Sequence, residues 1–139
     1  AGIGATGARM RISMITAGLL GLLLIALSAY VIAGRVKFKI DLGDGDNPAM
    51  IQRIRAQANF VEYVPLALIL LMLVEYASIG PRWLTMAMGG ALVAGRVLHA
   101  QGLIASSGAT AGRFIGTNLT ALVVVSGAIA LLGRGAGFW

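Results

Sequence analysis

The sequence predicts an all-α integral membrane protein in which four hydrophobic helices cross the bilayer as one bundle. Hydrophobic residues make up 58% of the 139 residues and charged residues only 12%, with a mean hydropathy of +0.88. Soluble domains carry about 25% charged residues, so this chain has too few charges to cover a water-exposed surface. Long uncharged runs also alternate with short polar segments, and roughly 20 apolar residues suffice for a helix to span the bilayer.

The first helix is predicted at about residues 12–35. No charged residue occurs from Ile12 to Gly34, and a helix of that length crosses the hydrocarbon core. Residues 1–9 are small and glycine-rich, and we expect them to be an N-terminal extension that is processed or introduced by cloning. Residues 10–139 then form a single four-helix transmembrane domain.

Turn-forming residues bound the other helices, which we place at about residues 48–78, 82–104 and 110–133. The first loop is rich in aspartate and glycine, and its aspartate spacing does not match a calcium-binding loop. Asp46 or Asn47 can cap a helix that begins at Pro48. Residues 79–81, Ile-Gly-Pro, end that helix, and residues 106–108, Ser-Ser-Gly, end the next one.

The charge distribution predicts an orientation in the membrane. Basic residues outnumber acidic residues by 11 to 5, and they lie at the ends of the apolar runs, where they contact lipid head groups rather than nucleic acid. The first loop and its borders carry more of them than the second loop: Arg35, Lys37, Lys39, Arg53 and Arg55 against Arg82. The positive-inside rule therefore places the first and third loops in the cytoplasm. In a bacterium the chain would lie in the inner membrane.

The chain contains no cysteine and a single histidine, His99. The absence of cysteine excludes disulfides, thiolate metal sites and a cysteine nucleophile within the sequence. A lone histidine also argues against a multi-histidine metal site. Any thiol chemistry must therefore use a thiol that a substrate supplies.

Polar residues interrupt two of the predicted helices. They occupy the first half of the second helix and the second half of the third: Gln52, Arg53, Arg55, Gln57, Asn59, Glu62 and Tyr63, then Arg96, His99 and Gln101. A charge inside the bilayer costs at least ~2.5–3.5 kcal/mol and by default indicates a functional site. Because successive helices alternate in direction, both polar halves lie on one side of the membrane. Arg35 and Arg113 lie at the same level, at the end of the first helix and the start of the fourth.

Helical geometry divides the polar residues of the second helix between two faces. Arg55, Asn59 and Glu62 fall within roughly 60° of one another, at ~100° per residue. Arg53 and Gln57 share the opposite face. A bundle offers this helix one inward stripe, so a second polar face predicts another protein surface and hence an oligomer. On the third helix, one face carries Arg96, His99 and Leu103.

The buried charges at this level are unbalanced, because only Glu62 opposes five arginines: Arg35, Arg53, Arg55, Arg96 and Arg113. An ion-pair network that merely locks the bundle is one interpretation. Arg55 and Glu62 are seven residues apart, however, so a partner or ligand must lie between them. A surplus of buried cations favours an anionic ligand, with Glu62 binding a ligand ammonium or holding an arginine. Glu75, at the other end, is expected to be merely interfacial.

The segment Arg55–Pro65, with the sequence RAQANFVEYVP, resembles the RAxxNxxEYxP signature of the MAPEG family, the membrane-associated proteins in eicosanoid and glutathione metabolism. The run Arg-x-x-His-x-Gln-Gly at residues 96–102 is similar to that family as well. The resemblance covers essentially residues 10–139. The short loops and the abundance of glycine and alanine are typical of bacterial members.

This resemblance implies a homotrimer with three glutathione sites between subunits, open to the cytosol. Family members hold glutathione through the residues that match Arg55, Asn59, Glu62 and Tyr63. The match to Gln57 lies near the trimer axis, and His99 falls on the glutathione-facing side of the third helix. Arg35 and Arg96 complete the candidate glutathione-binding set, and Arg113 resembles the catalytic arginine that stabilises the glutathione thiolate. Leu103 stands where eicosanoid-forming members have a tyrosine, which argues against eicosanoid synthesis.

The implied chemistry agrees with the residue types. Guanidinium groups match the two carboxylates of glutathione, and Glu62 matches its ammonium. An adjacent arginine lowers the pKa of a thiol, ordinarily about 8.5, and so activates it as a nucleophile. The apolar co-substrate would enter from the lipid between the first and fourth helices of adjacent subunits.

Three functions remain open from the sequence. The first is a glutathione-dependent membrane transferase or peroxidase, acting in detoxification on a hydrophobic electrophile or hydroperoxide. The second is a non-catalytic binding or structural protein of the same fold, which holds glutathione or another anion such as a lipid. The third is a small transporter with a midplane site. The confinement of polar residues to one side argues against this third function.

Overall fold

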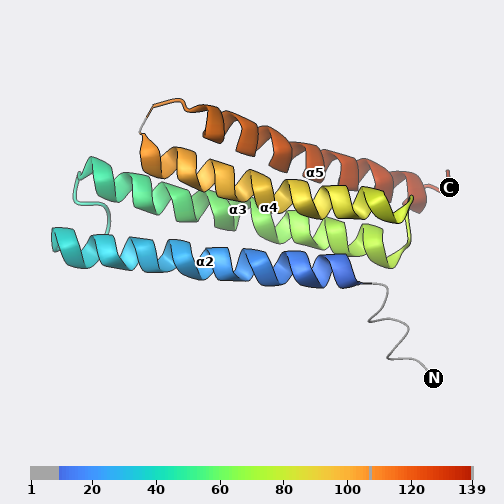
Figure 1. The fold of residues 1–139 in the computed structure, drawn as a ribbon, viewed down its shortest axis with the longest axis horizontal. Helices are drawn as coiled ribbons and strands as arrows, with labels where there is room; N and C mark the ends of the chain where they lie inside the picture. The colour runs from blue at the N-terminus through green and yellow to red at the C-terminus, as the bar shows by residue number, and fades with distance from the viewer. Residues whose placement is uncertain (1–9, 107, 139) are drawn as a thin grey trace, which may run out of the picture.

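The computed structural model describes residues 10–106 and 108–138, and within them the chain forms four α-helices. They are α2 (Arg11–Phe38), α3 (Pro48–Tyr76), α4 (Arg82–Ala105) and α5 (Ala111–Gly135). Figure 1 shows them lying lengthwise beside one another, with each helix running opposite to the one before it. The predicted four-helix bundle is confirmed, and each predicted helix boundary lies within a few residues of the observed one. The expected extension, residues 1–9, lies outside the described residues.

Local sequence explains where the helices begin and end. The Asn47 side chain accepts hydrogen bonds from the backbone nitrogens of Ala49 and Met50, at 3.0 and 3.1 Å, and so caps α3 as predicted. Lys39 ends α2 in a left-handed conformation (φ 57°), a common end for a helix. Thr110 caps α5 by accepting from the backbone nitrogen of Arg113. The helix α3 continues through Pro65.

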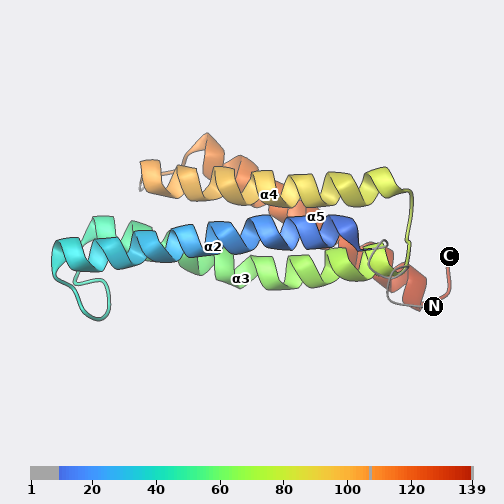
Figure 2. The ribbon, with the colours of Figure 1, turned by 60° about the horizontal axis from the view of Figure 1, so that its bottom comes forward.

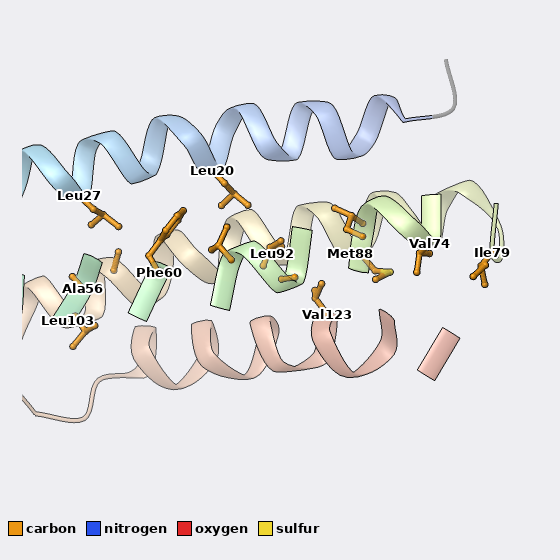
Figure 3. Packing of buried hydrophobic residues seen from close by; sticks show 14 residues of the cluster. Leu20, Leu27, Ala56, Phe60, Val74, Ile79, Met88, Leu92, Leu103 and Val123 are labelled. Carbon is orange, nitrogen blue, oxygen red and sulfur yellow. The ribbon is translucent and has the colours of Figure 1, made fainter. Parts of the chain in front are cut away.

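The apolar core runs along the whole length of the bundle. Figure 3 shows buried side chains from all four helices meeting between the ribbons, among them Leu27, Phe60, Leu92 and Val123. The outer faces are also apolar: Leu22 is 72% exposed and Leu132 is 73% exposed. A water-soluble protein does not expose continuous apolar helix faces of this kind. These faces therefore contact lipid.

Three helices, α2, α3 and α5, are long and apolar enough to cross a membrane. The fourth, α4, has 24 residues, which span about 36 Å. Its composition is less apolar because it carries the buried residues Arg96 and His99. It packs against each of the other three helices, so these polar groups face protein. The chain is a multi-pass integral membrane protein.

Glycines bring α4 and α5 into close contact. A Cβ atom on Gly116 would lie 2.7 Å from the Cβ of His99, and one on Gly102 would lie 2.6 Å from the backbone nitrogen of Arg113. No residue larger than glycine fits at either position without moving the backbone of the neighbouring helix. This packing fixes His99 and Arg113 relative to one another.

Candidate functional site

The predicted site residues lie toward one end of the bundle. Figure 1 shows that α2 and α4 end there and that α3 and α5 begin there. The turned view in Figure 2 shows the same arrangement, with the start of α2 and the end of α5 toward the opposite end. The topology therefore brings the polar half of α3 and the polar half of α4 to one side, as the sequence predicts.

A polar contact inside the bundle joins α4 to α3. Arg96 is 1% exposed, and its Nη2 atom donates a hydrogen bond of 2.8 Å to Oδ1 of Asn59. Its guanidinium carbon lies 5.7 Å from the centre of the Phe60 ring. The Nε atom of Arg96 has no hydrogen-bond partner among the described residues. Buried donors in proteins are nearly always paired, so this donor is left unsatisfied in the single protomer.

A cavity of about 450 Å³ opens on the other side of α4, against the start of α5. Four of the side chains that line it are polar: His99, Thr110, Thr117 and Asn118. Arg113 lines it as well, and its Nη1 atom donates a hydrogen bond of 2.6 Å to the carbonyl oxygen of Gly108. His99 is 5% exposed, and its Nδ1 atom has no partner within the part of the chain that the structure describes.

Electrostatic interactions, which act beyond direct contact, link these residues into one band. Arg96 is close enough to Glu62 and Tyr63 to interact with both electrostatically. His99 interacts in the same way with Arg96 and Arg113. The structure therefore brings together six of the nine predicted site residues: Asn59, Glu62, Tyr63, Arg96, His99 and Arg113.

The outer part of this band is exposed in the single chain. Arg55 and Glu62 are exposed on α3, and Tyr63 is 45% exposed. The structure records no hydrogen bond from Arg55 or Glu62 to another described residue. Ionisable groups on a membrane helix need protein, ligand or water beside them, so this face of α3 is incomplete in one protomer.

Two of the nine predicted site residues, Arg35 and Gln57, lie apart from this band, against the first loop and against α2. The Nη1 atom of Arg35 donates to backbone carbonyls of the first loop, at 3.1 Å for Gly43 and 3.2 Å for Asp41. The Nε2 atom of Gln57 donates to Oγ of Ser28 at 3.0 Å. The Nη1 atom of Arg53, which shares the face of Gln57, donates to the carbonyl oxygen of Tyr30 at 2.6 Å.

This arrangement corrects one step of the sequence argument. The face that carries Arg53 and Gln57 does not need a second subunit, because α2 of the same chain satisfies it. The sequence contains no sign of this contact because α2 has no charged residue between Arg11 and Arg35, while its backbone carbonyls and hydroxyls still accept hydrogen bonds. The α3 face that is open to another subunit is the one that carries Arg55 and Glu62.

Glu75, at the other end, also has a role that the sequence did not reveal. Its carboxylate accepts hydrogen bonds from the backbone nitrogens of Ile12 and Ser13, at 2.9 and 2.7 Å, and from Oγ of Ser13. The N-cap residue of α2 makes no side-chain cap hydrogen bond, and its first turn has no acidic residue. Glu75 therefore supplies the missing cap from another helix, which makes it more than an interfacial residue.

Comparison with known proteins places these features in a family. The family model described as MAPEG matches residues 13–133. The chain is also similar to the inner membrane protein YecN of Escherichia coli strain K12, at 33% identity over 91 residues that cover 66% of this chain and 69% of that protein. The protein of the same name from Escherichia coli O6:H1 matches to the same extent. The family match, over residues 13–133, includes every predicted site residue.

Proposed function

Because the chain belongs to the MAPEG family, we propose that it is a glutathione-dependent membrane enzyme. In this proposal it conjugates glutathione to a hydrophobic electrophile or uses glutathione to reduce a hydrophobic hydroperoxide. The observation that carries the proposal is the band of side chains from Glu62 through Arg96 and His99 to Arg113, in which cations exceed anions.

Charge balance favours an anionic ligand over a self-contained network. The recorded hydrogen bonds of Arg35, Arg53 and Arg96 all go to neutral oxygens, from backbone carbonyls or an amide. Such partners satisfy donors but leave the positive charge unbalanced. Glutathione carries two carboxylates and one ammonium, so it would bring net negative charge into this region.

The residue types suggest how glutathione would bind. Arg55 and the unpaired Nε atom of Arg96 are suited to its carboxylates, because guanidinium donors match carboxylate geometry. Glu62 is suited to its ammonium. Asn59 and Tyr63 supply further polar contacts on the same helix. Arg35 and Gln57 would support the loop and the α2–α3 seam that border this region.

Arg113 would act at the thiol. The positive charge of Arg113 would favour the thiolate and so lower the pKa of the thiol from about 8.5. The thiolate sulfur would attack an electrophilic carbon, form a carbon–sulfur bond, and release the leaving group with its electron pair. With a hydroperoxide, the sulfur would attack the terminal oxygen and release an alcohol. A second glutathione would then convert the resulting sulfenic acid into glutathione disulfide and water.

The hydrophobic co-substrate would reach this cavity from the lipid. Phe114 lines the cavity beside Arg113 and is 72% exposed. An apolar, lipid-facing wall next to a cationic group suits a reaction between a charged thiolate and a molecule dissolved in the bilayer. The exposed face of α3 supports a homotrimer in which a neighbouring subunit completes each site.

Calorimetry on the detergent-purified protein tests glutathione binding. We expect binding at millimolar concentration or tighter, weakened at least about tenfold in Arg55→Ala and in Glu62→Ala, because each change removes a charge-assisted contact. Arg134→Ala, an exposed arginine near the end of α5, is the matched control and should bind like the native protein. No binding at millimolar glutathione would overturn the proposal.

A thiolate absorbance measurement separates catalysis from simple binding. We expect the thiolate signal to rise when glutathione is added and to be lost in Arg113→Ala while binding persists. Glutathione binding without a thiolate signal, conjugation or peroxide reduction would instead support a non-catalytic member of the family that holds an anion.

A further inference from the structure

The end of the bundle opposite the candidate glutathione site contains a second polar cavity. Its volume is about 250 Å³, and it lies where α2 begins, α3 ends and α4 begins. The polar residues that line it are Arg11, Glu75, Ser78, Arg82 and Thr85. None of them belongs to the proposed glutathione site.

The charges in this cavity favour an anion. The carboxylate of Glu75 is already bound to the N-terminus of α2 through Ile12 and Ser13, where it balances the partial positive charge of the helix end. Arg11 and Arg82 are both exposed, and the structure records no hydrogen bond from either to another described residue. Two guanidinium groups therefore line the same cavity, and neither is paired with a carboxylate of a described residue.

An apolar groove continues from this cavity along the membrane-facing surface. It has a volume of about 410 Å³, and Ile12 lines both the cavity and the groove. From there it runs between α2 and α4, with Leu19 on one wall and Met86 and Val93 on the other. Figure 2 shows that the first halves of these two helices lie at the same end of the bundle.

Two adjacent glycines shape the groove. A Cβ on Gly89 would lie 2.6 Å from Oγ1 of Thr16, so Gly89 lets α4 approach α2 and forms the floor. A Cβ on Gly90 would meet nothing within 4 Å, so the groove is open above this residue. The groove therefore has space for a flexible chain.

We propose that this cavity and groove bind one phospholipid of the surrounding leaflet. Its phosphate lies between Arg11 and Arg82, and one acyl chain follows the groove between α2 and α4. The cavity lies at the ends of membrane helices, at the level of the lipid head groups. A free anion would leave the apolar groove unoccupied. An apolar helix of a second copy would leave the two arginines without a negative charge beside them. A molecule with an anionic head and an apolar tail matches both parts.

Native mass spectrometry of the detergent-purified full chain tests the head-group half of the proposal. With phosphatidylglycerol added, we expect one bound lipid per protomer. Arg11→Gln/Arg82→Gln should bind it at least about tenfold more weakly, because two charge-assisted contacts are lost. Arg134→Gln, at the same end of the bundle but outside the cavity, is the control and should bind normally. Equal binding by the native protein and the Arg11→Gln/Arg82→Gln variant would overturn the proposal.

A second comparison tests the groove. Gly90→Leu should fill the groove, because a Cβ at this position meets nothing within 4 Å, and should reduce lipid retention to a similar extent. Gly21→Leu places the same side chain where a Cβ also meets nothing within 4 Å, on α2 and outside the lining, and should retain lipid. If Gly90→Leu instead lowers the oligomeric mass and leaves lipid binding unchanged, the groove binds a second copy and the proposal is wrong.

The nature of the ligand is tested by two further probes. A neutral glycolipid with the same acyl chains should bind at least about tenfold more weakly than phosphatidylglycerol, and inorganic phosphate should not displace the phospholipid. Displacement by phosphate alone would indicate a free-anion site and would overturn the proposal. Glutathione binding should be unchanged in every variant, so failure here is distinguishable from failure of the proposed function.

Discussion

Arg96 carries a positive charge that the fold must stabilise inside the bundle. It is almost completely buried, and its one recorded hydrogen bond goes to Asn59. A buried charge without partners is strongly destabilising, whereas the same charge with a well-placed acceptor is tolerated. The pair therefore connects α3 to α4 and orients the Asn59 amide, which we propose to be a glutathione contact.

Removal of the Asn59 side chain should show how strongly the stability of the fold depends on its hydrogen bond with Arg96. We expect Asn59→Ala to lower the free energy of unfolding by about 1.5–3 kcal/mol, because it leaves the guanidinium of Arg96 without its acceptor. Thermal unfolding in detergent measures the effect. The double variant Asn59→Ala/Arg96→Met should be less destabilised than the sum of the two single variants. Additive losses would show that the two side chains do not interact.

Glu75 should also contribute to the free energy of unfolding. Glu75→Ala removes three hydrogen bonds at the start of α2 and should lower the free energy of unfolding by about 1.5–3 kcal/mol. Ser13→Ala removes only one of them and should cost about 0.5–1.5 kcal/mol. Thermal unfolding of both variants makes the comparison, and equal losses would contradict the cap that we describe.

At the scale of elements, the packing of α4 on α5 determines the geometry of the candidate site. Gly102 and Gly116 allow the two backbones to approach closely. His99 and Arg113 face one cavity because of this approach. The distance between these two helices therefore determines how His99 and Arg113 face the cavity.

The substitution Gly116→Ala tests this connection. Its Cβ would lie 2.7 Å from the Cβ of His99, so α5 must move away from α4, at a cost of about 1–3 kcal/mol. We expect loss of the glutathione thiolate signal together with reduced thermal stability. Gly18→Ala, where a Cβ meets nothing within 4 Å, is the control and should leave both unchanged. An intact thiolate signal in Gly116→Ala would show that the site does not depend on this packing.

Helix boundaries could be predicted from the sequence because the chain marks them locally. Asn47 with Pro48 begins α3, and uncharged runs set the lengths of the spans. The gathering of polar residues at one end follows from helix direction alone. The contacts of Gln57 with α2 and of Glu75 with Ser13 could not be predicted. These contacts depend on how each helix is rotated about its own axis relative to its neighbour. The apolar residues around them do not indicate that rotation.

At the scale of the whole molecule, the positive charges around the first loop predict the orientation in the membrane. The chain has no cysteine, so single introduced cysteines report their side of the membrane without background. We expect Ser78→Cys to react with a membrane-impermeant maleimide in intact cells and Asp44→Cys to react only after lysis. The reverse pattern would invert the orientation and place the candidate glutathione site outside the cytoplasm.

A single protomer leaves ionisable groups of α3 uncovered, and this predicts how the protein assembles. Arg55 and Glu62 are exposed on α3, and each ionisable group left in lipid costs at least ~2.5–3.5 kcal/mol. A second protein surface removes this cost, and we predict a homotrimer of three times the 14.3 kDa protomer mass that binds three glutathione molecules. Native mass spectrometry in mild detergent measures both numbers.

The variant Arg55→Leu/Glu62→Leu makes the assembly prediction specific. It removes the polar groups that need a neighbour, so we expect a larger fraction of monomer and the loss of glutathione binding. Arg134→Leu changes an exposed arginine near the end of α5 and should remain trimeric. A native protein that is monomeric and still binds glutathione fully would mean that one protomer forms the whole site. The exposed face of α3 would then be open to water rather than covered by protein.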